Sequence, residues 1–148
     1  MSHRALFYHI VFSTKQRRPF LAGDILAKIC QYMGGIARKL EGQILLANGT
    51  TDHVHLAASI PATMAVADFI RMVKTNSSGW LHETFANLHG FQWQEGYAAF
   101  TVSPSVLPQV KRYISHQAVH HRRLSFQEEL VSLLEKHGVE YDKRYIWR

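Results

Sequence analysis

The sequence predicts an α+β domain with a ferredoxin-like β-α-β-β-α-β order: an antiparallel sheet with helices on one face, followed by a C-terminal helix that carries a tyrosine. Residues 5–13 (ALFYHIVFS) are dense in aromatic and β-branched side chains, as in a mostly buried strand. Apolar residues recur at helical spacing over 23–40 and again over 64–80. With 47% apolar residues, the 148-residue chain can bury one core, so we expect a single domain over 1–148.

The first half of the chain predicts a strand, a helix and a hairpin. A basic connector, 14–19 (TKQRRP), separates the first strand from the helix over 23–40, which Asp24 is placed to cap. Residues 42–48 and 52–59 are expected to pair as a hairpin, with Asn48-Gly49 as its turn signal. The apolar stripe of the helix consists of Ile25, Ile29, Met33, Ile36 and Leu40.

The second half predicts a helix, a loop, a strand and two further helices. Pro61 ends the hairpin, a loop covers 86–96, and a last strand covers 97–102. Ser103-Pro104-Ser105 is a helix-start signature for a helix over 106–123, and 126–137 is amphipathic. The inward residues are expected to be Val66, Phe69, Ile70, Val73 and Trp80 on the helix over 64–80, and Val106, Val110, Ile114 and Leu124 on the later one.

Composition points to a polyanionic partner. The formal net charge is +6 and the pI is near 9.7, which favours nucleic acid over an acidic membrane surface. No apolar run is long enough to span a bilayer, and the N-terminus lacks a secretory signal, so we expect a cytoplasmic protein without a membrane partner. The ten histidines invite a search for metal ligands.

His53-Val54-His55 is the first candidate site. On a strand, the two imidazoles share one face and Val54 points to the other, so His53 and His55 could ligate one divalent ion. Nitrogen ligands suit Zn, Mn, Fe or Ni, whereas Mg requires oxygen ligands to complete its shell. A chain with ten histidines also produces such a pair by chance, so a pair without a metal remains an alternative.

Tyr113 is the second candidate. Tyr113 and Gln117 are four residues apart on a helix and share a face. A phenol attacks phosphate poorly at neutral pH unless a metal polarises the phosphate or a base takes the proton, and Gln117 could supply an oxygen ligand. The alternative is a packing aromatic at the edge of the core. The helix is also rich in groups that suit phosphate: Lys111, Arg112, His116, His120, His121, Arg122 and Arg123.

DNA contacts are expected from two further basic groups. Lys15, Arg17 and Arg18 follow the first strand, and Arg71 and Lys74 lie on the helix over 64–80. Exposed aromatics such as Trp93 or Tyr97 could stack on unpaired bases. The alternatives are solvated charges and core aromatics.

Together these segments resemble the small single-tyrosine transposases of the HUH superfamily, including the REP-associated type. The resemblance covers essentially the whole chain, in order. It rests on FYHIVFSTK (7–15), TDHVHL (51–56), IRMVKTNSS (70–78), WQEGYAAF (93–100), VKRYISHQ (110–117) and HHRR (120–123).

The resemblance implies specific roles. His53 and His55 are similar to the HUH metal ligands, Gln117 to the polar third ligand, and Tyr113 to the nucleophile. The family uses Mg or Mn and recognises single-stranded DNA hairpins at element ends. Cleavage leaves a 5′-phosphotyrosine, which a 3′-hydroxyl attacks to rejoin strands. Many members are homodimers in which the tyrosine helix completes the partner's site in trans, whereas the REP-associated type is typically monomeric.

Two alternative functions compete with this one. The same fold and charge would suit a non-catalytic single-stranded nucleic-acid-binding domain in which the histidines and Tyr113 are structural. A metal phosphohydrolase is disfavoured, because such enzymes usually need a third close-spaced ligand or a second H-x-T/S motif, and the sequence has neither.

Overall fold

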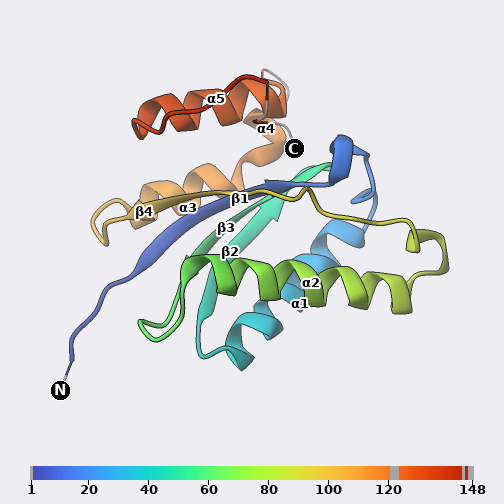
Figure 1. The fold of residues 1–148 in the computed structure, drawn as a ribbon, viewed down its shortest axis with the longest axis horizontal. Coiled ribbons are helices and arrows are strands. Elements are labelled where there is room, and N and C mark those ends of the chain that lie inside the picture. The colour runs from blue at the N-terminus through green and yellow to red at the C-terminus, as the bar shows by residue number, and fades with distance from the viewer. Residues whose placement is uncertain (1, 121–123, 145, 147–148) are drawn as a thin grey trace.

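The structure is a computed structural model that describes residues 2–120, 124–144 and 146. Its centre is a four-stranded sheet of β1 (Phe7–Ser13), β2 (Gln43–Gly49), β3 (His53–Ser59) and β4 (Ala98–Val102). The strand order is β2-β3-β1-β4 and every pairing is antiparallel (Figure 1). The predicted ferredoxin-like arrangement is confirmed.

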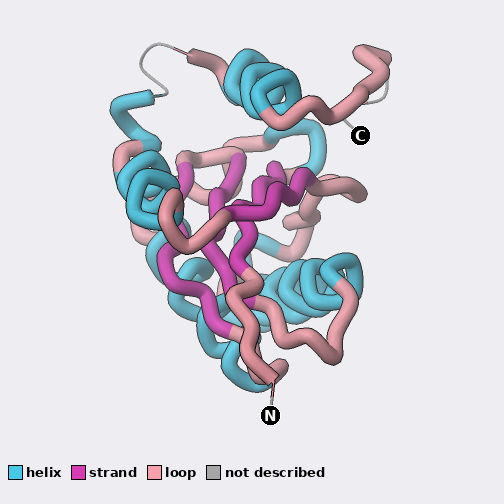
Figure 2. The backbone as a smooth tube through the Cα atoms, turned by 90° about the vertical axis from the view of Figure 1, so that its left-hand side faces the viewer, coloured by secondary structure: helices cyan, strands magenta, loops and turns pink. Residues whose placement is uncertain are grey.

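One face of the sheet is covered by α1 (Ile25–Lys39) and α2 (Val66–Thr84) (Figures 1 and 2). Because side chains alternate along a strand, Ile10 and Phe12 of β1 and Val54 and Leu56 of β3 face these helices. α2 runs four residues beyond its expected end, and its buried stripe is Phe69, Ile70, Val73, Ser77 and Leu81.

The opposite face carries α3 (Leu107–Ser115), α4 (Gln117–His120) and α5 (Phe126–Lys136), which lie above the sheet in Figure 1. A second apolar cluster joins α5 to this face: Val11, Phe100, Phe126, Leu130, Leu133 and Leu134. Two short 3₁₀ turns, η1 (Lys15–Arg17) and η2 (Ala86–Leu88), complete the described elements. In the described part of the chain, no helix combines the length and apolar character needed to cross a membrane.

The β2–β3 turn differs from its expected position. Asn48 and Gly49 belong to β2, and residues 50–52 make the turn. A Cβ on Gly49 would lie 2.1 Å from the carbonyl oxygen of His53, so glycine here permits close backbone approach rather than turning the chain. The Asn48 amide instead donates to the carbonyl of Ile114 over 3.0 Å, which ties β2 to α3.

The expected side-chain cap of α1 is wrong, although the helix starts directly after Asp24. Asp24 precedes α1 but has helical backbone angles, whereas a side-chain cap requires an extended residue, and its carboxylate pairs with Lys28 at 2.9 Å instead. The helix-start signature at 103–105 is confirmed, because α3 begins at Leu107.

The expected helix over 106–123 is interrupted. His116 leaves the helical conformation and separates α3 from α4, while residues 121–123, which include His121, Arg122 and Arg123, lie outside the described residues. Val106 and Leu124 are 42% and 39% exposed, so they do not belong to the core as expected, whereas Ile114 is fully buried. The break matters for the site, because it starts α4 at the buried Gln117.

Candidate active site and metal centre

The two histidines of β3 are fully buried on the sheet face opposite α1 and α2. Their ring centroids are 5.2 Å apart, as expected for alternate residues of one strand. Neighbouring Val54 packs into the α1–α2 core. The prediction that His53 and His55 share one face of the sheet while Val54 points to the other is therefore confirmed.

The tyrosine helix lies over the histidine pair. The Gln117 Oε1 atom is 3.1 Å from Nε2 of His53, and the rings of Tyr113 and His55 have centroids 5.9 Å apart. Tyr113 is half-buried and Gln117 is completely buried. The four residues singled out in the sequence thus come together within one chain.

A fifth residue, Glu129 of α5, occupies the middle of this group and is 1% exposed. One carboxylate oxygen, Oε1, lies 2.9 Å from Nε2 of His55 and 3.4 Å from Nε2 of His53. The other, Oε2, accepts hydrogen bonds from the Tyr113 hydroxyl and from the Gln117 amide, the latter at 3.1 Å.

Sequence reasoning missed Glu129, although a signal was present. Phe126, Leu130 and Leu133 form the inner stripe of α5, and Glu129 is the one acidic side chain that shares this buried side. A carboxylate on the apolar side of an amphipathic helix requires a buried partner, which indicates a site rather than a solvated charge.

The outer nitrogens of both imidazoles are also held. Nδ1 of His53 lies 2.8 Å from Oδ1 of Asp52 and 2.9 Å from the Thr50 hydroxyl. Nδ1 of His55 lies 2.8 Å from Nε2 of the buried His9. Both Nε2 atoms are consequently directed toward Glu129.

Burial and hydrogen bonding shift the ionisation of these groups. Burial alone would lower the pKa of His53, but the carboxylates of Asp52 and Glu129 outweigh it and raise that pKa. Burial alone would raise the pKa of Glu129, yet hydrogen bonds from His53 and His55 hold it well below its usual range. Burial, together with Glu129, raises the pKa of Tyr113 far above that of a free phenol.

The donor set fits a divalent cation. Ligand atoms of His53, His55 and Glu129 all lie within 4.8 Å of one another, and the Gln117 oxygen is adjacent. Two imidazoles, an amide oxygen and a carboxylate form a mixed nitrogen–oxygen set that suits Mn and accommodates Mg. Partners on the outer nitrogens are typical of metal-binding histidines.

The basic residues expected to contact DNA come from three parts of the chain. The side chains of Lys15 and Arg18 after β1, Arg71 on α2, and Lys111 and Arg112 on α3 are exposed, and that of Arg17 is half-buried.

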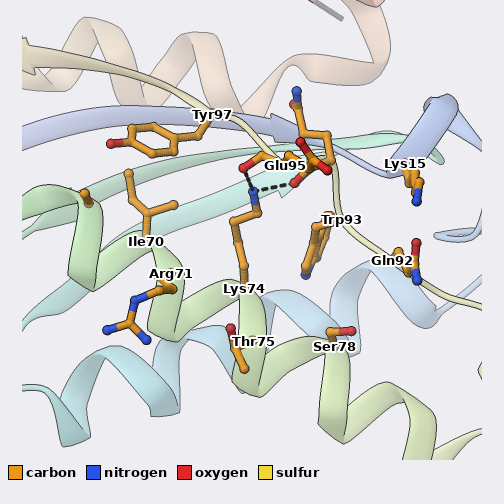
Figure 3. Close-up of a pocket in the computed structure, with 12 residues that line it drawn as sticks. Lys15, Ile70, Arg71, Lys74, Thr75, Ser78, Gln92, Trp93, Glu95 and Tyr97 are labelled. Carbon is orange, nitrogen blue, oxygen red and sulfur yellow. Dashed lines mark hydrogen bonds between the residues drawn. The ribbon is translucent and has the colours of Figure 1, made fainter. Parts of the chain in front are cut away.

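Lys74 differs from the others in this set. Its ammonium group donates to the carbonyls of Gln94, Glu95 and Gly96, at 2.6, 3.3 and 2.8 Å, and burial lowers its pKa to about 8 (Figure 3). These bonds give Lys74 a structural role in holding the segment before β4.

The two aromatic residues expected to stack on unpaired bases differ in their exposure. Trp93 is 8% exposed and donates to the Ser77 hydroxyl at 3.0 Å, so it is a core residue rather than an exposed stacking platform. Tyr97 is 43% exposed and lies beside Ile70 at the wall of a cavity of about 580 Å³ (Figure 3). Lys15 and Arg71 line the same cavity.

The family described as "Transposase IS200 like" matches residues 2–117 of this sequence. The chain belongs to the IS200-like transposase family. Among curated IS200-like transposases, those for insertion sequence element IS200 of Salmonella typhimurium and Salmonella typhi are 33% identical over 123 residues, covering 74% of this chain and 75% of theirs. The ISDra2 transposase TnpA of Deinococcus radiodurans is 26% identical over 117 residues, covering 76% of this chain and 84% of its own.

Solved structures support the fold of this IS200-like transposase. A Deinococcus radiodurans structure described as a transposase superposes with a TM-score of 0.63 at 22% identity, covering 79% of this chain and 95% of that one. A REP-associated tyrosine transposase bound to a REP hairpin gives a TM-score of 0.60 at 16% identity, covering 82% of this chain and 74% of that one.

Proposed function

We propose that this IS200-like transposase cuts and rejoins single-stranded DNA at hairpin-bearing ends, with Tyr113 as nucleophile and a divalent metal at His53 and His55. The observation that carries this proposal is the convergence of Tyr113 and Gln117 on the histidine pair. The relative solved with a REP hairpin adds support for a hairpin as the recognised form.

His53, His55 and Gln117 would hold Mg or Mn through two imidazole nitrogens and one amide oxygen. When bound, the ion would supply Lewis-acid polarisation of the scissile phosphate. The raised pKa keeps the Tyr113 phenol neutral at physiological pH, so its activation depends on the groups around it.

The chemistry balances without an external energy source. The Tyr113 oxygen forms a bond to phosphorus while the bond from phosphorus to the 3′ oxygen breaks. The phenol loses one proton, and the leaving 3′ oxygen gains one. The products are a 3′-hydroxyl and a 5′-phosphotyrosine. Because the phosphodiester count is conserved, attack by another 3′-hydroxyl rejoins strands and releases Tyr113.

The DNA contacts are assigned to exposed cations and one aromatic. Lys111 and Arg112 flank the nucleophile on α3, and Tyr97 can stack on an unpaired base. Lys15, Arg17, Arg18 and Arg71 would provide the remaining phosphate contacts. Lys74 is left out of this set because its ammonium group donates to the carbonyls of residues 94–96.

A homodimer that exchanges its tyrosine helices would assemble the same residues from two chains. The contacts of Tyr113 and Gln117 with the histidines and Glu129 join residues of one chain, which favours a site formed in cis. An experiment that mixes two inactive variants, one altered at His55 and the other at Tyr113, separates the two arrangements.

The test uses an oligonucleotide carrying the flanking hairpin, incubated with Mn and resolved on a denaturing gel. A 3′-end label should migrate with the protein, whereas a 5′-end label should mark a shortened strand with a 3′-hydroxyl. Tyr113→Phe should abolish both products, and Tyr32→Phe, on the surface of α1, should leave them unchanged. A Tyr113→Phe protein that still forms the adduct would refute the nucleophile, and a wild-type protein that binds the hairpin without forming an adduct would favour the non-catalytic binding domain.

A further inference from the structure

We propose that Glu129 is a further ligand of the metal and that its second oxygen orients the Tyr113 hydroxyl. This inference rests on the proposed function and extends it to a residue of α5. Glu129 lies beyond residues 2–117, the part of the chain that matches the family, so this ligand comes from the C-terminal segment.

The two oxygens of Glu129 face different partners. Oε1 is directed at the metal-facing nitrogens of both histidines, at 2.9 and 3.4 Å. Oε2 accepts from the Tyr113 hydroxyl and from the Gln117 amide. One carboxylate therefore spans the distance between the metal position and the nucleophile, with a separate oxygen for each.

Burial argues that this contact is functional rather than incidental. A carboxylate removed from water loses a large hydration free energy unless cations or hydrogen-bond donors replace it. Glu129 is 1% exposed, and its partners include four groups of the candidate site: His53, His55, Tyr113 and Gln117. A divalent cation among the same groups would compensate its charge.

The ligand preferences of Mg and Mn also favour Glu129 as a ligand. Two neutral imidazoles and one amide provide no negative charge, and Mg and Mn favour carboxylate oxygens. Glu129 supplies the anionic oxygen that the sequence-derived set of His53, His55 and Gln117 lacks.

α5 holds the carboxylate rigidly. Ser125 and Glu128 form a capping box at the start of the helix. The Phe126 ring packs against the His53 ring with centroids 4.5 Å apart, and Leu130 and Leu133 anchor the next turns in the second apolar cluster. Glu129 is therefore positioned by residues on both sides of it.

A calorimetric titration of the full-length protein with Mn, in the absence of DNA, tests whether Glu129 is a metal ligand. Glu129→Gln preserves shape but removes the charge, and we expect Mn to bind at least about tenfold more weakly. Glu135→Gln, an exposed substitution on the same helix, should bind Mn like the wild type. Tyr113→Phe should also keep wild-type Mn affinity, because the phenol contacts Glu129 Oε2 rather than the metal position.

Glu129→Asp provides a second variant if Glu129→Gln does not fold. It retains the charge but shortens the side chain, so Mn should bind more weakly than to the wild type, while adduct formation should fall because the Tyr113 hydroxyl loses its acceptor. Unchanged or tighter Mn binding in the folded variant would overturn the inference, because the carboxylate would then merely fill the metal position. Loss of Mn affinity in Tyr113→Phe would overturn the division of roles between the two oxygens.

The outcomes distinguish this inference from the proposed function. If the wild type forms a tyrosine adduct but Glu129→Gln binds Mn normally, only the role of Glu129 is wrong. If the wild type binds Mn through Glu129 but forms no adduct, the metal site stands and the transposase chemistry fails.

Discussion

Nε2 of His9 lies 2.8 Å from Nδ1 of His55, and both imidazoles are buried in the sheet. Val11 faces His55 across β1 and β3, so His9 is a diagonal neighbour on the same face. A histidine that binds a metal through Nε2 carries its proton on Nδ1, and His9 is the group placed to accept it. Burial and, to a smaller extent, the charge of His55 lower the pKa of His9 to about 3. His9 is therefore a neutral acceptor at physiological pH.

His9→Phe should therefore weaken Mn binding by about tenfold, because the His55 proton loses its acceptor and the ring loses its orientation. Calorimetry gives the affinity, and long-range ¹H–¹⁵N spectra report which nitrogen of His55 carries the proton. His89→Phe, at an exposed position, is the control. Normal Mn affinity in His9→Phe would show that His9 is only a packing residue.

Mixing two inactive proteins should not restore activity. His55→Ala removes a proposed metal ligand and Tyr113→Phe removes the proposed nucleophile, and both residues contact Glu129 within one chain. Equimolar mixtures of the two variants should give no covalent adduct on a denaturing gel. Adduct formation by the mixture would instead establish that the tyrosine helix acts in trans within a homodimer.

Two glycine substitutions should change stability in opposite directions. Gly49→Ala should destabilise the fold by about 2 kcal/mol, because its Cβ would collide with the His53 backbone. Gly79→Ala, inside α2 with open space around the added methyl group, should stabilise it by about 0.5–1 kcal/mol. Urea denaturation measures both, and equal effects would contradict the close approach of β2 and β3.

Substitution of Tyr97 should weaken DNA binding, whereas substitution of Trp93 should lower the stability of the fold. Tyr97→Ala should weaken single-stranded DNA binding by about 1–3 kcal/mol through lost base stacking, with little effect on unfolding. Trp93→Ala should cost about 3–5 kcal/mol of stability through a core cavity. Fluorescence anisotropy and thermal unfolding report the two quantities, and unaltered DNA affinity in Tyr97→Ala would remove the stacking role.

Lys111 should contribute to the salt dependence of DNA binding. Each phosphate contact made with a single strand adds about 0.7 to the slope of log affinity against log salt concentration. Lys111→Ala should reduce the slope by that amount, whereas Lys39→Ala, at the end of α1 on the other side of the sheet, should leave it unchanged. Equal slopes in the two variants would place the DNA away from α3.

Local periodicity accounts for much of what the sequence predicted. The two-residue repeat of a strand places His53 and His55 together, and the helical repeat predicts α1, α2 and the core face of each. Turn and cap chemistry was less informative. Asn48-Gly49 and Asp24 have the composition of a turn and a cap, but strand pairing and the backbone angles of Asp24 give them other roles.

The sequence by itself determined the strand and helix order, the shared face of the two histidines, and the family-like spacing of Tyr113 and Gln117. Only the tertiary structure decided that Glu129 and His9 reach the same centre, from 74 and 46 residues away from His55. Periodicity states which side of an element a residue faces, but not which distant element covers that side. The packing of Phe126 and Leu130 of α5 against Val11 and Phe100 of the sheet decides this, and it brings the Glu129 carboxylate to the two histidines of β3.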